Sequence, residues 1–290
     1  MSSPNAESAA PSGLRAYAYR SSWRAIAGVL VAVGHGSLLA IAAWLLATEE
    51  PVTVARLGSL VVAFALLPQA AAGLVRRALV ARVTVEGGQL VVERPGWRLD
   101  VPVASIAALR PWRMPLPGPG LGLRLRSGRG LPYGLETRDP LALVDALTDG
   151  GADVGAAARE HPVVVYAHAK ARSRERRWWH RLGKFVVFPL VPTAVWFNAH
   201  QHIAYGGLLG QYYLEGLRPY LTTLVVSWGL AACYVLLYAA VARAAVEAVD
   251  LLTAAVAPSL AARVRRAAEI TLGVVYYGGI PALVVLPFLR

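Results

Sequence analysis

The sequence predicts a membrane α-helical protein of about five transmembrane helices, with a mainly-β module inserted among them. Hydrophobic residues make up 56% of the 290-residue chain, and its mean hydropathy of +0.48 is too high for an ordinary soluble domain. Five long apolar stretches account for this composition. Between the second and the third lies a basic block of roughly 110 residues, whose apolar positions alternate as they do in strands.

Residues 25–75 are expected to form the first two transmembrane helices, after a cytosolic N-terminal tail of residues 1–24. Residues 25–47 hold no charged side chain and reach about 30 Å as a helix, which is enough to span a bilayer core. This stretch is too long for a cleaved signal peptide, so we expect it to remain as an anchor. The second apolar stretch covers residues 57–75 and ends at a pair of arginines.

Residues 184–290 are expected to hold the other three transmembrane helices, at 184–205, 220–241 and 269–289. The inner connection, residues 243–266, is amphipathic, because its apolar residues recur near helical spacing beside charged ones. We expect helical extensions that lie on the inner surface of the membrane or project from it. An ordinary amphipathic linker is the alternative.

The arginines orient the chain, because basic residues accumulate in cytosolic loops. With five spans, the arginine-rich segments all fall on one side of the membrane. They are the N-terminal tail, the central block of residues 76–183 and the connection 243–266. The connection 201–219, on the opposite side, carries only Arg218. We therefore expect a multi-pass inner-membrane protein, with a cytosolic N-terminus and an outer C-terminus.

The central block is expected to meet anionic lipid headgroups. Residues 76–183 contain 18 basic and 10 acidic side chains, a balance that would also suit nucleic acid. Because membrane segments flank the block on both sides, the bilayer is the nearer partner, and no nucleic acid is expected. The alternative is that the excess of arginine reflects only the orientation of the chain in the membrane.

The central block also has the pattern of a small β-rich module. Residues 82–94 predict two strands around the turn Glu86-Gly87-Gly88, and residues 97–103 predict a third. Residues 121–126 and 131–135 predict another hairpin. A helix is expected over residues 139–147, with Asp139 as its cap, and one more strand over residues 161–166.

The order of these elements resembles the bacterial pleckstrin-homology-like domains that are often attached to membrane spans. The resemblance is carried by "LDVPVASIAALRPW" at residues 99–112 and by "LETRDPLALVDAL" at residues 135–147, and it covers about residues 81–147. It implies a small curved β-sheet capped by a C-terminal helix. It also implies a role in binding or assembly, but it identifies no ligand residues.

Two segments are candidates for contact with the membrane interface. In the Pro/Gly-rich loop 111–122, Trp112 and Met114 lie beside Arg110 and Arg113, and we expect them to dip into the interface unless the loop packs on its own sheet. A polybasic juxtamembrane segment precedes the third span, and each basic residue near an anionic surface is worth about 1 kcal/mol. Its candidate residues are Arg172, Arg174, Arg176, Arg177, Trp178, Trp179, Arg181 and Lys184.

Histidines mark the positions where a metal or haem would bind, although no cofactor is predicted. His200 and His202 lie at the outer end of the third span, and a zinc or copper site would need further ligands such as Glu215 or His35. Interfacial hydrogen bonding is the alternative explanation for this cluster. His35 lies near the middle of the first span, where a histidine is either functional or bonded to a neighbouring helix.

The sequence contains no nucleotide-binding loop, no His-Glu-x-x-His and no Gly-x-Ser-x-Gly motif, and its only cysteine, Cys233, cannot build a disulfide or a Cys-x-x-Cys site. The first hypothesis is therefore a non-enzymatic binding or assembly subunit with a lipid or membrane-protein partner. The second is a metal- or haem-binding redox subunit. The third is a small-solute channel or transporter with a polar path through Gln69, His35 and Tyr276.

Overall fold

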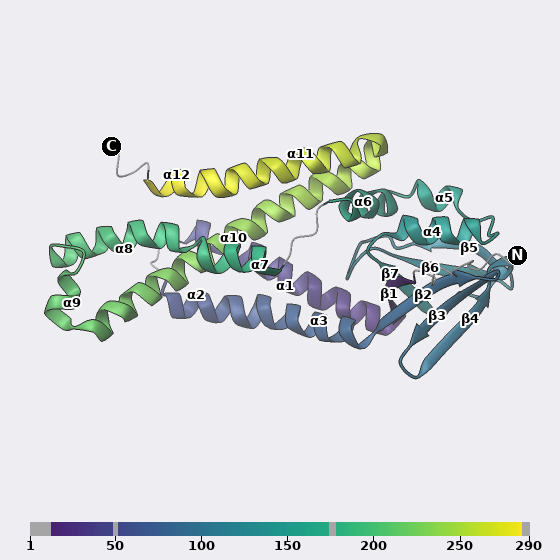
Figure 1. Ribbon diagram of the computed structural model, residues 1–290, viewed down its shortest axis with the longest axis horizontal. Helices are drawn as coiled ribbons and strands as arrows, with labels where there is room; N and C mark the ends of the chain where they lie inside the picture. Colours follow the sequence, from purple (N-terminus) through teal and green to yellow (C-terminus); the bar gives the residue numbers. More distant parts are fainter. Residues whose placement is uncertain (1–12, 49–51, 174–177, 286–290) are drawn as a thin grey trace, which may run out of the picture. The chain divides into compact units, whose positions relative to one another are not determined.

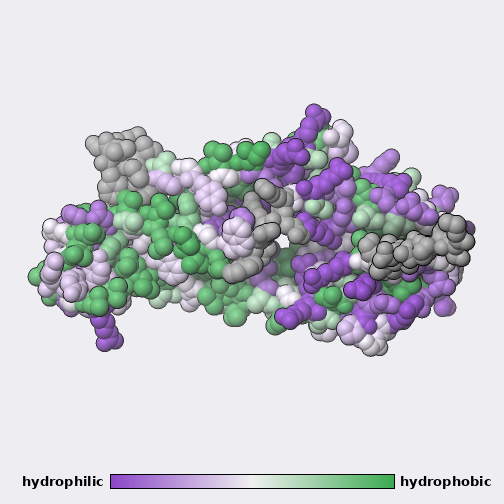
Figure 2. All heavy atoms as spheres, in the orientation of Figure 1, coloured by the Kyte–Doolittle hydropathy of each residue, from purple (hydrophilic) through white to green (hydrophobic). Residues whose placement is uncertain are grey.

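The computed structural model describes residues 13–48, 52–173 and 178–285 (Figure 1). The chain divides into two compact units. The sheet unit comprises the described parts of residues 1–29, 72–171 and 254–258. The helical unit comprises the described parts of residues 30–71, 172–253 and 259–290. Figure 2 shows that the visible surface of the helical unit is largely hydrophobic, whereas that of the sheet unit is largely hydrophilic.

A curled antiparallel sheet of seven strands forms the sheet unit, in the order β4-β3-β2-β1-β7-β6-β5 (Figure 1). The strands are β1 (Leu14–Arg20), β2 (Val80–Glu86), β3 (Gln89–Arg94), β4 (Trp97–Pro102), β5 (Ile106–Pro111), β6 (Gly120–Leu125) and β7 (Tyr133–Thr137). The predicted β2–β3 hairpin, with its turn at Gly87 and Gly88, is confirmed, and so is the third strand. The expected curved sheet is therefore present.

The central strand comes from the segment that was expected to be a tail. β1 pairs with β2 on one side, where Tyr17 faces Val80, and with β7 on the other, where Tyr17 faces Glu136. Ala16 and Ala18 are fully buried in the sheet core. The prediction of a tail over residues 1–24 is therefore wrong for its described part. The strand gives only a weak signal in the sequence, because its inward positions are small alanines and not strongly hydrophobic side chains.

The core of the sheet unit lies between the sheet and a set of short helices. α4 (Pro140–Asp149) buries Leu143, Val144 and Leu147 against the strands, and Asp139 caps it by accepting a hydrogen bond from the Leu141 amide at 3.1 Å. α5 (Ala156–Arg159) and α6 (Pro162–Ala171) follow. The strand expected over residues 161–166 is wrong, because this valine-rich segment forms α6 and packs on α4.

Three helical runs are long and apolar enough to cross a membrane in the part of the chain that the structure describes. They are α1 (Ser21–Ala47), the continuous run of α2 (Val54–Leu60), η1 (Val61–Leu66) and α3 (Leu67–Ala78), and α10 (Leu217–Val256). Within the helical unit, Leu38 of α1, Leu57 of α2 and Leu237 of α10 meet in one buried cluster. These runs agree with the first, second and fourth predicted spans.

The third predicted span is helical but interrupted by a turn at Phe188 and Pro189, whereas the fifth lies in one continuous helical run over its described part. Residues 178–205 form α7 (Trp178–Leu182), η3 (Gly183–Val187) and α8 (Leu190–Tyr205), and a short α9 (Gly210–Glu215) follows. The chain closes with α11 (Ala261–Val274), η5 (Val275–Gly279) and α12 (Ile280–Val285). The rings of Phe188 and Tyr276 join these two segments, with centroids 4.9 Å apart. The count of five spans therefore remains a prediction.

α10 is longer than a membrane requires. Its 40 residues extend about 60 Å, twice the roughly 30 Å of a bilayer core. The apolar part ends near residue 241, and the helix continues through Arg243 to Val256 before a 3-10 turn and α11. The predicted helical extension of the connection 243–266 is confirmed.

Candidate functional site

The sheet unit contains the beginning of α1 and the end of α3, the two helices that open and close the first apolar pair. α1 begins at Ser21, directly after β1 ends at Arg20, and only Leu79 separates the end of α3 from β2. Because β1 and β2 are neighbours in the sheet, the helix pair is inserted between two adjacent strands. The base of this helical hairpin is thus held by the sheet.

Trp112 packs inside this junction instead of reaching an interface. Its side chain is 5% exposed, and the guanidinium of Arg24 lies 4.7 Å from its ring centroid. Gly120 and Gly134 make room for the indole, since a Cβ on either would lie within 3.0 Å of it. The expectation that Trp112 dips into the membrane is wrong, and the alternative of a loop packed on its own sheet holds for this residue. Arg113 is exposed.

A buried ion pair fastens α3 to the sheet. Glu136 of β7 is 2% exposed and forms an ion pair with Arg76 on the last turn of α3. The Arg76 guanidinium also lies 4.9 Å from the ring of Tyr17. Glu136 Oε2, Arg76 Nε and the Tyr19 hydroxyl are buried without a hydrogen-bond partner among the described residues. Burial raises the pKa of Glu136 above its usual value, and the charge of Arg76 opposes this only in part.

An arginine face covers one edge of the sheet. We use this name for the five exposed arginines in and beside β5 and β6, which are Arg110, Arg113, Arg124, Arg126 and Arg129. The outward side chains alternate with a buried row that includes Leu121 and Leu123. Residues 101–135 contain no acidic side chain. Of the five, only Arg113 was a candidate from the sequence, although the alternation of leucine and arginine over residues 121–126 is a signal that could have indicated Arg124 and Arg126.

The polybasic segment is described only in part. Arg174, Arg176 and Arg177 lie outside the described residues, and Trp178 and Arg181 belong to α7 without described side chains. Arg172 is exposed. Trp179 is 51% exposed and stacks on His180, with ring centroids 4.0 Å apart. The Lys184 amine lies 4.2 Å from the ring centroid of Tyr276.

The structure does not gather the candidate metal ligands. In the described parts of the chain, no three His, Cys, Asp or Glu side chains lie close enough to hold a metal. His202 Nδ1 lies 2.9 Å from the carbonyl oxygen of Asn198, one turn earlier, while Glu215 accepts hydrogen bonds from Gln211 and Tyr205 at 2.8 and 3.3 Å. His200 packs edge-on against Tyr205.

His35 contacts a neighbouring helix, as one of the two sequence interpretations expects. Its Nδ1 lies 2.7 Å from the amide nitrogen of Gln69, which comes from α3. Gly34 makes this approach possible, because a Cβ there would lie 2.8 Å from the Gln69 side chain. Tyr276, the third group of the supposed polar path, donates instead to the carbonyl oxygen of Lys184 at 2.9 Å.

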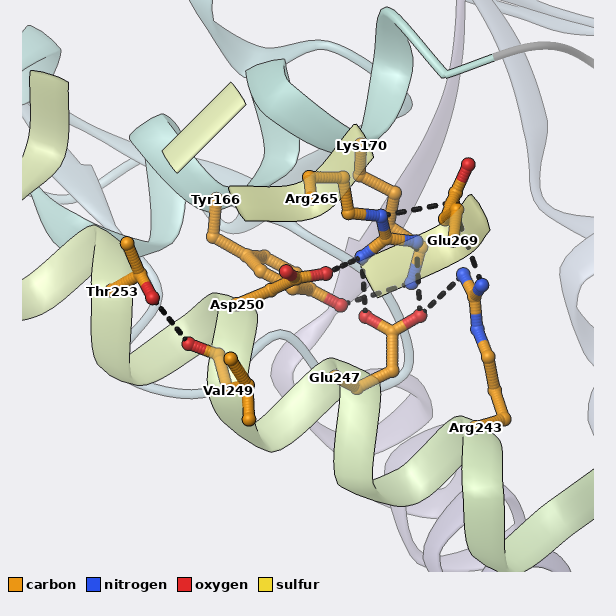
Figure 3. A network of polar contacts seen from close by, with 9 residues as sticks. All are labelled: Tyr166, Lys170, Arg243, Glu247, Val249, Asp250, Thr253, Arg265 and Glu269. Atoms are coloured by element: carbon orange, nitrogen blue, oxygen red, sulfur yellow. Dashed lines mark hydrogen bonds and ion pairs between the residues drawn. The ribbon is translucent and has the colours of Figure 1, made fainter. Parts of the chain in front are cut away.

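A second ion cluster joins α10 to α11 in the helical unit (Figure 3). Arg265 is 2% exposed and contacts three carboxylates, which belong to Glu247, Asp250 and Glu269. Arg243 contacts Glu247 and Glu269 as well. Burial alone would lower the pKa of Arg265, but the hydrogen bonds and charge of its partners raise it. The spacing Arg265 to Glu269 is a helical i,i+4 pair that could be found in the sequence, whereas the pairs to α10 could not.

No family model, curated protein sequence or solved structure matches the chain.

Proposed function

We propose that this chain is a multi-pass protein of the bacterial inner membrane that acts as a non-enzymatic binding or assembly subunit. Its sheet unit is a pleckstrin-homology-like module on the cytosolic side, and it meets anionic headgroups at the inner face. The strand order, with α4 directly after the last strand, supports the pleckstrin-homology-like identity. A membrane-protein partner held at the same surface would suit the assembly role.

One observation carries the proposal. The helices that run from Ser21 to Ala78 leave and re-enter the sheet at neighbouring strands, with at most one residue between helix and strand. If these helices span the membrane, neither of these two connections gives the module a linker on which to move away from the surface. Such a connection suits a binding module that works against the bilayer.

The arginine face supports an anionic ligand. Its five side chains are exposed on one edge of the sheet, and the sequence around them carries no acid that would neutralise them. The opposite edge is mixed in sign, since Arg98 of β4 contacts Glu93 and Asp100, each at 3.0 Å. Of the two edges of the sheet, the β5–β6 edge is thus the one whose arginines form no ion pair with a described residue, and it presents positive charge to a headgroup layer.

Lipid contact can be tested with the full-length protein in nanodiscs. Cys233→Ala removes the only cysteine, and Ser127→Cys, between Arg126 and Arg129, then reports on the arginine face. We expect a water-soluble maleimide to label Ser127→Cys more slowly when phosphatidylglycerol is added to a zwitterionic bilayer, and high salt should restore the rate. Gln89→Cys, exposed at the β2–β3 turn, is the control. Equal rates at Ser127→Cys in both bilayers would contradict the contact with anionic lipid.

The topology has its own test in the same cysteine-free background. Tyr213→Cys lies in the connection between the third and fourth predicted spans, and Tyr213 is 76% exposed. Five spans place positions 127 and 213 on opposite sides of the membrane, so a membrane-impermeant reagent should label only one of them in intact spheroplasts. Labelling of both positions, or of neither, would mean that residues 184–205 do not cross.

A further inference from the structure

The loop between β5 and β6 is anchored at both of its ends and leaves a short exposed tip. Trp112 is buried at the start of the loop, and Pro117 and Gly118 are buried at its end. Between these anchors, Arg113 is exposed and Met114 is 65% exposed. Arg113 and Met114 therefore form a small exposed tip, one basic and one apolar side chain, on a loop that is held at both sides.

The second anchor lies against α1. A Cβ at Gly28 would meet the backbone and side chain of Leu116 at 3.8 Å, which is ordinary van der Waals contact. Gly28 is four residues beyond Arg24, the last charged residue before the apolar stretch, and four residues rise about 6 Å along a helix. Leu116 therefore lies about one turn inside the apolar part of α1.

Two other side chains on α1 also indicate that the loop lies near the headgroup layer. Trp23, in the first turn of the helix, is 47% exposed, and tryptophan prefers the headgroup layer. Arg24 covers the buried ring of Trp112 at the base of the loop. The tip of the loop is thus beside the helix at the depth where headgroups give way to acyl chains, provided that α1 crosses the bilayer.

We propose that residues 113–116 form a bilayer-inserting loop, in which Met114 enters the acyl-chain boundary and Arg113 binds headgroup phosphate. The proposal rests on the proposed membrane topology. It names the lipid surface of the protein's own membrane as the occupant, because α1 and the loop share one level and no acidic side chain lies in the loop. A second copy of the chain or a protein partner over Met114 is an outcome that the test distinguishes.

The test uses the full-length protein with Cys233→Ala, reconstituted in nanodiscs. A fluorophore on Met114→Cys is compared with the same fluorophore on Ser127→Cys in the same unit. Lipids that carry a quencher at a shallow acyl position should quench the label at position 114 more strongly than the label at 127. A charged thiol reagent should also modify unlabelled Met114→Cys more slowly in nanodiscs than in detergent, which makes the result independent of the polarity of the fluorophore.

A third position separates the two proposals. Val33 is 44% exposed on α1, and a label at Val33→Cys should be quenched by lipids with a deep quencher if α1 spans the membrane. Quenching at 33 without quenching at 114 would overturn the inserting loop alone. Absence of quenching at 33 would overturn the topology and the loop with it. A label at 114 that is shielded from an aqueous quencher but is not reached by lipid quenchers would identify a protein contact and overturn the inserting loop.

Discussion

Arg265 and Arg76 are both paired with buried carboxylates, but they are satisfied to different extents. Arg265, between α10 and α11, is 2% exposed and has three carboxylate partners. The Arg76 side chain, at the junction of α3 with the sheet, is 35% exposed and has one, and its Nε is left without a partner. Asp250 Oδ1 also lacks a hydrogen-bond partner among the described residues, but all three guanidinium nitrogens of Arg265 are bonded. A buried guanidinium that is fully bonded fixes one geometry, whereas one that is incompletely bonded is more sensitive to its surroundings. We infer that the α10–α11 cluster mainly stabilises the packing of these two helices. The Arg76–Glu136 pair, in contrast, should respond to changes in pH.

The largest effect is expected at Arg265. Arg265→Leu would leave Asp250 buried beside two further carboxylates, which should lower the free energy of unfolding by about 3–5 kcal/mol. Arg263→Leu is the matched control, because Arg263 is exposed on the same helix and should change stability by no more than about 0.5 kcal/mol. Denaturant titration of both variants in detergent measures the difference. Equal stability of the two variants would mean that the cluster does not stabilise this packing.

A smaller loss is expected at Arg76. Arg76→Met leaves Glu136 buried without its cation, which should cost about 1–3 kcal/mol, less than at Arg265 because Arg76 is partly exposed. Arg77→Met, at the exposed neighbouring position, is the control. The same titration applies, with tryptophan fluorescence as the signal. If Arg77→Met were as damaging as Arg76→Met, the ion pair would not be what holds α3 to the sheet.

The Arg76–Glu136 pair should also respond to pH. Because burial raises the pKa of folded Glu136 above its unfolded value of about 4.5, the folded state binds the proton more tightly than the unfolded chain does. Wild-type stability should therefore fall as pH rises from about 4.5 through the raised pKa, by at most about 1.4 kcal/mol per pH unit. Glu136→Gln cannot titrate at this position. Its melting temperature should therefore rise relative to that of the wild type as the pH increases across that window. A relative loss with rising pH would mean that Arg76 holds the pKa below its usual value.

The smallest effect is expected at the surface. Arg98 contacts Glu93 and Asp100, each at 3.0 Å, but its side chain is 59% exposed. Arg98→Ala should lower the free energy of unfolding by less than about 1 kcal/mol, because water screens exposed ion pairs. The three arginines then form a series in which the cost follows burial. A loss at Arg98 as large as that at Arg265 would remove burial as the explanation.

The candidate sites differ in how far local sequence patterns could predict them. Part of the arginine face, Arg124 and Arg126, has a local signal in the sequence, because leucine and arginine alternate over residues 121–126. Glu136 and Arg76 are 60 positions apart, and no local pattern pairs them. Trp112 was misjudged for a related reason. A tryptophan beside arginines in a Pro/Gly-rich loop has the composition of an interfacial anchor, but glycines 120 and 134, on two other strands, open a site for its ring.

The sequence by itself determined the apolar helices, the helical extension beyond residue 241 and most of the strands, because hydropathy and periodicity are properties of neighbouring residues. Only the tertiary structure decided that Leu14–Arg20 is the central strand, since its place depends on pairing with strands more than 60 residues away. The same pairing inserts the first helical hairpin into the sheet. It also brings the 113–116 loop beside α1, and such long-range closure leaves no local trace in the chain.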